Sequence, residues 1–332
     1  MTAAQLSNLA MVTSVVLYVA ALLAHAAEWA LARDVPAGRP VRALRTSVGA
    51  GAGAAAPDPD GPADGADGAD GADPLPPPTG SSGAGAELAA RLGVALLLVG
   101  FAAHTVSVVA RGVAANRPPW GNMYEFVTAA SLVIVAGYLV LVWRWGLRWL
   151  GLGVALLAAV LNGLAVTVFY VPVAPLVPAL RSVWFVIHIA AALLSGAAFN
   201  VGGLAAIAYL LKSRAESRGR TGGLVTKLPA SAAIDRLSYR VLAFSFPIWT
   251  FTIAAGAIWA QYAWGRYWGW DPKETWSLIT WVVYAAYLHA RATAGWSGRR
   301  AAWIAVAGFT LFWFNFVGIN LLVAGLHSYA GI

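Results

Sequence analysis

The 332-residue sequence contains no cysteine and few charged residues. Without cysteine the chain forms no disulfide, no thiolate metal site and no thiol nucleophile, so any thiol chemistry must use the cysteines of a partner. Charged residues make up 11% of the sequence, hydrophobic residues 60%, and the mean hydropathy is +0.69. This composition excludes an ordinary soluble domain and indicates an all-α, polytopic integral membrane protein.

Basic residues are absent from the first 32 positions. A secretory signal peptide begins with a positively charged region, so we predict that residues 1–33 hold a retained membrane span. The motifs of common hydrolases are absent too: the sequence has no HExxH, no phosphate-binding loop and no Ser-His-Asp set at matching membrane depth. We therefore expect no catalytic nucleophile in this chain.

Apolar segments long enough to cross a bilayer occur eight times, which predicts about eight transmembrane helices. They cover residues 6–31, 88–110, 123–143, 149–170, 183–211, 241–260, 276–292 and 301–324. Placing both termini outside puts seventeen of the 22 Lys and Arg residues on the cytoplasmic side and five outside, as the positive-inside rule requires. This distribution explains the net charge of +8, so the charge is no reason to expect nucleic-acid binding.

Residues 34–86 differ in composition from the rest of the chain. They are rich in Ala, Gly, Pro and Asp, and residues 65–73 repeat Gly-Ala-Asp three times. Because such a segment has almost nothing to bury, we predict a disordered cytoplasmic insertion between the first span and a membrane domain over residues 87–332.

Residues 264–276 read WGRYWGWDPKETW and are predicted to lie outside the membrane. Trp264, Trp268 and Asp271 are spaced as on one face of a helix, which predicts a flat aromatic surface for a large planar ligand. Asp271 followed by proline, with Glu274 three residues later, predicts a capped helix start. An interfacial belt of aromatic anchors is the structural alternative.

A second helix start is predicted at residues 119–125, PWGNMYE. Asn122 occupies the N-cap position and Glu125 lies three residues later, as in a capping box. The predicted topology places this loop on the same side as the Trp-rich segment. A purely structural cap is the alternative.

The segment WGRYWGWDPKETWSLITW resembles the tryptophan-rich "WWD" signature of haem-handling membrane proteins in cytochrome c assembly. PWGNMYE is similar to the P-x-S-N-M-Y-E loop of the CcsA/ResC family, the System II haem-attachment proteins (named CcsB in some actinobacteria), and residues 325–329, GLHSY, agree with that family. The resemblance covers roughly residue 88 to the end and leaves residues 34–86 uncovered.

The resemblance implies haem export and its presentation on the outer face of the plasma membrane for thioether attachment to apocytochrome c. It implies haem b in transit, a ResB/Ccs1-like partner membrane protein, an apocytochrome with Cys-x-x-Cys-His, and a thiol-reducing thioredoxin-like protein. Synthase activity would belong to the complex with the partner. Alternatives are a System I haem delivery protein, a quinone or other apolar cofactor transporter, and a membrane redox subunit with permanent haems.

The five histidines are sorted by predicted depth. His188 and His327 flank the Trp-rich segment at one membrane level and could supply both axial ligands of a haem iron. His289 lies near the inner end of the seventh span, where the resemblance implies a second haem site with a ligand from the partner. His25, beside Glu28, and His104 are weaker candidates for that ligand. A packed, hydrogen-bonded core histidine is the alternative for His25, His104 and His188, and a solvated tail histidine is the alternative for His327.

The remaining predicted contacts surround the porphyrin. Arg266 and Lys273 are the expected partners of the haem propionates, with interfacial snorkelling as the alternative. The predicted haem-binding set is Trp264, Arg266, Tyr267, Trp268, Trp270, Asp271, Lys273 and Trp276, joined by the loop residues Trp120, Asn122, Tyr124 and Glu125.

Overall fold

The computed structural model describes residues 1–31, 81–220, 225 and 228–327. The regular structure of these residues is entirely helical, as the composition predicts. The predicted insertion at 34–86 lies outside the described residues up to position 80, and the second helix already begins at Ser81.

The helices follow the order of the predicted apolar segments. They are α1 (Ala3–Leu31), α2 (Ser81–Ala115), α3 (Met123–Trp145), α4 (Gly151–Thr167), α5 (Val183–Glu216), α6 (Ser231–Trp264), α7 (Pro272–Ala292), α8 (Arg299–Trp313) and α9 (Ile319–Leu322). A π-helical turn, Phe314–Gly318, joins α8 to α9, and short 3₁₀ turns cover Arg148–Leu150 and Pro178–Leu180.

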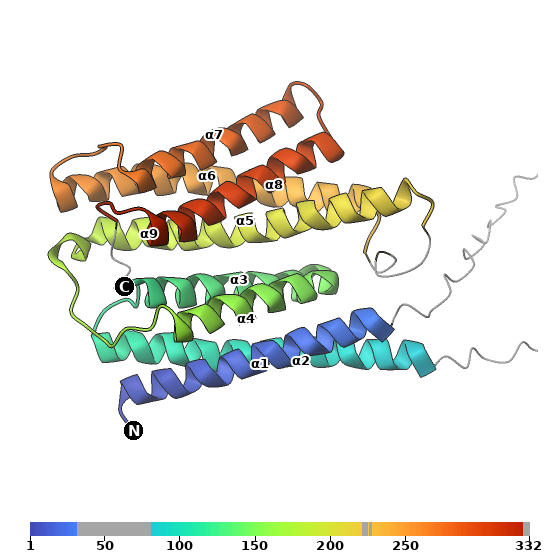
Figure 1. Cartoon of the computed structure of the whole chain (residues 1–332), viewed down its shortest axis with the longest axis horizontal. Coiled ribbons are helices and arrows are strands. Elements are labelled where there is room, and N and C mark those ends of the chain that lie inside the picture. Colours follow the sequence, from blue (N-terminus) through green and yellow to red (C-terminus); the bar gives the residue numbers. More distant parts are fainter. Residues whose placement is uncertain (32–80, 221–224, 226–227, 328–332) are drawn as a thin grey trace, which may run out of the picture.

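Consecutive long helices run in opposite directions (Figure 1). The α2–α3, α4–α5 and α6–α7 connections therefore meet at one end of the bundle, together with the residues after α9; we call this the motif end. The α3–α4, α5–α6 and α7–α8 connections lie at the opposite, far end. The structure thus gathers the Trp-rich segment, the loop before α3 and His327 at one end, as the sequence predicts.

Within the part of the chain that the structure describes, seven helical segments are long and apolar enough to cross a membrane, which makes this a multi-pass membrane protein. The expected span at 276–292 forms α7, but α7 is not among these seven. Its 21 residues include Lys273, Glu274, His289 and Arg291, so its sequence is more polar than the others. At 1.5 Å per residue it is about 30 Å long, the thickness of a hydrocarbon core. Because α7 also packs against α6 and α8, we treat it as embedded in the bundle.

The bundle has two parts that meet at α3 and α5. The α1–α2 hairpin packs on α4 and α3, whereas α5 and α6 pack together and against α8 (Figure 1). Buried aliphatic residues of α3 and α4 form one core, and Phe199, Tyr284 and Phe312 centre a second, aromatic core. The candidate site lies where these parts meet at the motif end.

Candidate functional site

A cavity of about 190 Å³ opens among α3, α5, α6, α7 and α8 at the motif end. Its walls are mainly apolar and aromatic. Among the predicted site residues, the structure places Trp120, Asn122, His188, Tyr267, Trp268, Lys273 and His327 in its lining. Residues from four separate stretches of sequence therefore converge on one cavity.

His188 lies in the second turn of α5 and is held by α6. Its Nδ1 lies 2.9 Å from the backbone carbonyl oxygen of Thr252. A carbonyl oxygen can only accept, so Nδ1 carries the proton and Nε2 keeps its lone pair. A Cβ on Gly256 would come within 2.8 Å of the imidazole, so glycine at this position leaves the space that the ring occupies. The His188 ring also stacks on the indole of Trp259, with centroids 5.7 Å apart.

His327 lies in the residues after α9 and is held by the helix cap of α7. Its Nδ1 lies 2.8 Å from Oδ2 of Asp271, and Oδ1 of Asp271 accepts a 2.7 Å hydrogen bond from the backbone N–H of Leu326. Burial alone would raise the pKa of Asp271, but the hydrogen bonds from His327 and from the backbone N–H groups of Leu326 and Lys273 lower it to about 2. Asp271 is therefore a carboxylate at neutral pH, so Nδ1 of His327 donates, and in the neutral form of the ring the lone pair is on Nε2.

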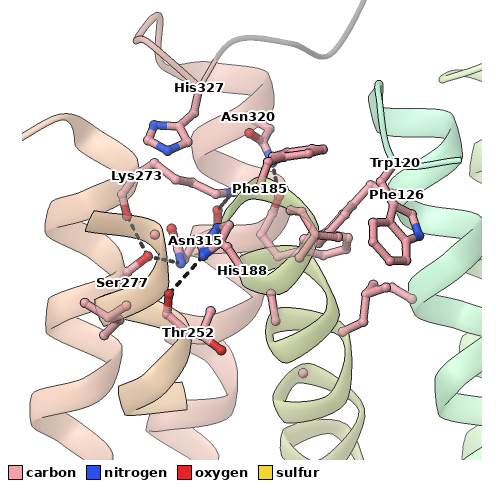
Figure 2. A pocket seen from close by; sticks show the side chains of 18 of the residues that line it. Trp120, Phe126, Phe185, His188, Thr252, Lys273, Ser277, Asn315, Asn320 and His327 are labelled. Carbon is pink, nitrogen blue, oxygen red and sulfur yellow. Dashed lines mark hydrogen bonds between the residues drawn. The ribbon is translucent and has the colours of Figure 1, made fainter. Parts of the chain in front are cut away.

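The two histidines share an environment as well as a tautomer. The indole of Trp259 lies 5.5 Å from the His327 ring as well as beside His188, and Trp264 lies 4.9 Å from His327. Figure 2 shows both imidazoles at the cavity, with His327 nearer the motif end and His188 deeper, next to Thr252. Two imidazoles, each oriented through a hydrogen bond at Nδ1, have the arrangement by which histidines in their neutral form bind a metal through Nε2.

The Trp-rich segment does not form the predicted helical face. α6 ends at Trp264, because Gly265 adopts the left-handed conformation (φ +72°) that terminates helices. Residues 265–271 are not helical, and Trp270 also has a positive φ of +58°. As a result Trp268 lines the cavity while Trp270 is 68% exposed, although their rings lie edge to face at 5.8 Å. The expectation that Trp264, Trp268 and Asp271 share one helix face is wrong.

The predicted capping box at the start of α7 is confirmed. Glu274 accepts hydrogen bonds from the backbone N–H groups of Gly269 (2.8 Å) and Asp271 (3.1 Å), and it forms a 2.9 Å ion pair with Arg266. The carboxylate of Glu274 thus fixes the path of the chain between the two helices.

The two predicted propionate partners both have partners within the protein. Arg266 pairs with Glu274, and Nζ of Lys273 donates a 2.6 Å hydrogen bond to the carbonyl oxygen of Asn315. Trp276 is not part of the cavity lining and packs on Phe314, with ring centroids 4.4 Å apart. Of these three residues, only Lys273 lines the cavity.

The loop before α3 is fixed by a buried ion cluster. Asn122 caps α3 as predicted, its side chain accepting from the backbone N–H of Glu125 (2.9 Å). The side chain of Glu125 is fully buried and bonds to Arg111 (2.9 Å), Arg117 (2.7 Å) and the backbone N–H of Gly121 (2.8 Å). Glu125 therefore reaches Gly121, and the full capping box expected there does not form.

The same cluster ties two loops of the motif end together. Arg111 donates to the carbonyl oxygen of Val171 and Arg117 to that of Ala174, and Arg111 lies over the ring of buried Tyr124. The sequence analysis missed both arginines. They could have been found from the sequence, because they are two of the five basic residues on the side where the positive-inside rule expects few basic residues.

His25 and His104 lie away from the cavity, in the α1–α2 hairpin. His25 is fully buried and bonds to Glu28 at 2.9 Å, as predicted from their spacing. A Cβ on Gly93 would approach the His25 ring to 2.8 Å and one on Gly151 to 2.5 Å, so the ring fills its site and leaves no room for a porphyrin. His104 is also fully buried and bonds to the hydroxyl of Tyr18 at 3.1 Å.

His289 is exposed on the surface of α7 near the far end. Helix α1 packs on α2 and α4, whereas α7 packs on α6 and α8, and Figure 1 shows the two at opposite edges of the bundle. The structure therefore does not bring His25 and His289 together.

Two asparagines add polar groups that the sequence analysis missed. Asn200 and Asn315 line the cavity, and each has a buried amide oxygen without a hydrogen-bond partner among the described residues. Asn315 lies in the π-helical turn after α8, a distortion that often marks functional sites. These oxygens are available to a ligand or to water.

Comparison with known proteins identifies the family of this arrangement. The model of the cytochrome c assembly protein family matches residues 120–327, the range from the α3 loop to His327. The chain belongs to the cytochrome c assembly protein family. Within it, the chain is 36% identical over 277 residues to the cytochrome c biogenesis protein CcsA of Picosynechococcus sp., covering 66% of this chain and 82% of that relative. The predicted resemblance to the CcsA family is thereby confirmed.

Two further comparisons agree. CcsA of Guillardia theta is 46% identical over 171 residues, covering 47% of this chain and 57% of that relative. Among solved structures, the cytochrome c haem lyase CcmF superposes with a TM-score of 0.58 at 16% identity. That match covers 96% of this chain and 49% of the lyase, so the chain spans about half its length and shares its fold. In this cytochrome c assembly protein, α1 and α2 precede the matched range and so lie outside the family model.

Proposed function

We propose that this chain exports haem and presents it at the motif end for covalent attachment to apocytochrome c. The observation that carries the proposal is the pair His188 and His327 at one aromatic cavity, both with Nδ1 engaged and with Nε2 lacking a hydrogen-bond partner among the described residues. Haem b is here the cargo, and two neutral imidazoles are suitable axial ligands for its iron.

The reaction requires binding and orientation more than a nucleophile. Each cysteine S–H of apocytochrome adds across a haem vinyl group: sulfur forms the C–S bond and a hydrogen goes to the other vinyl carbon. The chain contributes proximity and orientation by holding the iron and stacking the porphyrin, which agrees with its lack of cysteine. Synthase activity then belongs to the chain together with a partner.

The size of the cavity bears on how the haem is held. At about 190 Å³ it is smaller than the roughly 300–1,000 Å³ typical of sites that enclose their ligand. A haem bound here is therefore only partly enclosed, on the side of Trp268 and Trp259. The vinyl edge stays outside, where an apocytochrome carrying Cys-x-x-Cys-His can reach it.

The proposal includes orientation and partners. The motif end faces the outside of the plasma membrane, where a thioredoxin-like protein keeps the apocytochrome cysteines reduced. His289 binds haem earlier, near the cytoplasmic side. Its exposure on α7 supports a second ligand from a ResB/Ccs1-like membrane partner packed against that helix.

The ligands are tested by spectroscopy of the purified protein and by its haem transfer. We expect a Soret band of bis-histidine character, and loss of cytochrome c maturation when either His188 or His327 is replaced by Ala, with recovery on adding imidazole. His104→Gln, which alters a buried histidine outside the cavity, is the matched control. Normal maturation by the double variant His188→Ala with His327→Ala would refute the proposal. Haem that stays on the protein when apocytochrome is added would favour a permanent redox subunit instead.

Orientation is tested separately, and the absence of native cysteine makes the labelling clean. Val183 is exposed at the motif end and Trp296 lies between α7 and α8 at the far end. Single cysteines at these two positions should react with an impermeant reagent from opposite sides of the membrane, with position 183 outside. Labelling of both from one side would contradict the topology.

A further inference from the structure

A second cavity lies at the far end of the bundle, away from both histidines of the candidate site. Its volume is about 480 Å³, and it is formed by the end of α1, the start of α4, the last turns of α5 and residues 225 and 228. Figure 1 shows these helix ends at the end opposite the Trp-rich segment. The cavity is therefore at the depth of the other bilayer surface.

The lining changes from charged to apolar along the helix axes. Arg214, Arg218 and Arg220 surround the cavity where α5 ends, and Leu204 and Ile207 line it two to three turns deeper. The charges therefore lie at the depth of headgroups, and the apolar walls lie at the depth of acyl chains.

None of these three guanidinium groups pairs with a carboxylate within the described residues. The ion pair nearest in sequence joins Lys212 to Glu216 and involves none of them. Cations at the end of a helix are stabilised by its dipole, and basic residues gather at the cytoplasmic end of membrane helices. Neither effect requires an apolar cavity between the arginines.

An unpartnered donor lies in the same cavity. Trp149 lines it, and the indole Nε1 is buried without a hydrogen-bond partner among the described residues. A buried N–H without an acceptor is energetically unfavourable, so an acceptor supplied by a ligand would stabilise this arrangement. Trp29 of α1 faces the same space and widens its aromatic wall.

We propose that this cavity binds one anionic phospholipid. The arginines hold the phosphate, Trp149 Nε1 donates to an ester oxygen of the glycerol, and one acyl chain lies along Leu204 and Ile207. Ile207 is 36% exposed and Leu211, also in the lining, is 59% exposed, so the mouth opens on the lipid-facing surface. Haem also has acidic groups on an apolar body, but it fits this cavity less well. Among the described residues that line the cavity there is no histidine, methionine or tyrosine to bind its iron. The inference does not depend on haem export.

The test is native mass spectrometry of the full chain released from detergent with added lipid. We expect one tightly held phosphatidylglycerol and no equivalent retention of phosphatidylcholine. The triple variant Arg214→Gln, Arg218→Gln, Arg220→Gln should bind phosphatidylglycerol about tenfold or more weakly, equivalent to about 1.4 kcal/mol. The matched control is Arg236→Gln, Arg240→Gln, Arg299→Gln, which removes the same charge from exposed positions that do not line the cavity.

A second variant tests the apolar part without changing charge. Ala208→Phe places a ring in the cavity and should lower lipid retention while the haem spectrum stays unchanged. Equal losses in the control triple variant would overturn the proposal, because they would show attraction by net charge alone. Displacement of the lipid by inorganic phosphate would also overturn the proposal. So would a triple variant that no longer binds free haem but still binds phosphatidylglycerol.

Discussion

Replacing Asp271 by Asn should weaken haem binding while leaving the fold intact. In the native protein the carboxylate accepts from Nδ1 of His327 at 2.8 Å and from the backbone N–H of Leu326 at 2.7 Å. Oδ2 of Asp271 also accepts from the backbone N–H of Lys273 (3.1 Å), but Glu274 supplies the other half of the capping box, so α7 should still begin at the same residue. The amide, however, has one oxygen, and the N–H of Leu326 competes for it with the groups on the Oδ2 side.

If the amide oxygen stays with Leu326, the amide NH₂ faces His327. The imidazole then accepts through Nδ1 and carries its proton on Nε2, which removes the lone pair needed by iron. Loss of a partner that orients a metal-binding histidine typically lowers affinity about 10- to 100-fold, and we expect that range here. A hydrogen bond to a charged group contributes about 1.5–3 kcal/mol, which agrees with this size of effect.

The assay is titration of the purified variant with haem, followed at the Soret band. The matched control is Asp235→Asn, which removes a carboxylate bonded to Arg291 at the far end (2.8 and 2.9 Å). Because the pKa of Asp271 is lowered to about 2 from its ordinary 3.8, its contact with His327 is complete at neutral pH and is lost only as pH falls toward 2. Titration at pH 7 therefore measures the full effect. Unchanged haem affinity in Asp271→Asn, or an equal loss in Asp235→Asn, would refute the orienting role.

Three other substitutions give distinct expected results. Gly256→Ala should favour the α6 helix by up to about 1 kcal/mol, but the new methyl group should displace the His188 ring. We therefore expect loss of the bis-histidine spectrum without a lower melting temperature, and a normal spectrum would contradict the predicted clash. Glu125→Gln leaves buried Arg111 without its counter-charge and should cost about 3–5 kcal/mol, seen as a lower melting temperature in detergent; an unchanged midpoint would show that the cluster is unimportant for stability. His289→Ala should reduce the haem co-purified with the partner complex. Haem added directly should still bind normally at the motif end, and a loss of both would argue against an earlier, separate step.

Much of the site was predictable because its signals are local. Asp271, the proline after it and Glu274 lie within one turn of chain and together predict a helix start. The carboxylate of Asp271 at this start is the group that holds the His327 ring. The alternation of apolar segments and basic loops also predicts which motifs share an end of the bundle, and therefore that His188 and His327 lie at the same end, although His188 lies deeper.

The missed features depend on contacts between distant segments or on backbone conformation. The left-handed Gly265 and Trp270 turn the Trp-rich segment out of a helix, and the spacing of tryptophans does not reveal that. A glycine following a helical pattern is a known termination signal, so Gly265 offered a clue. Nothing local to Thr252 indicates that its carbonyl group will orient His188.

The two histidines are anchored unequally, and this has a stereochemical consequence. His188 belongs to a 34-residue helix and bonds to the backbone of α6, so in the proposed function its release from haem iron would require α5 or its own side chain to move within a packed core. His327 follows the short α9 and is fixed by one carboxylate. We expect the histidine of an incoming apocytochrome to take the place of His327. The peptide then approaches one face of the porphyrin only, and the two faces of haem are not equivalent, because its vinyl groups are arranged asymmetrically. An unequal pair of ligands would thus decide which cysteine meets which vinyl group, and so the handedness of the finished attachment.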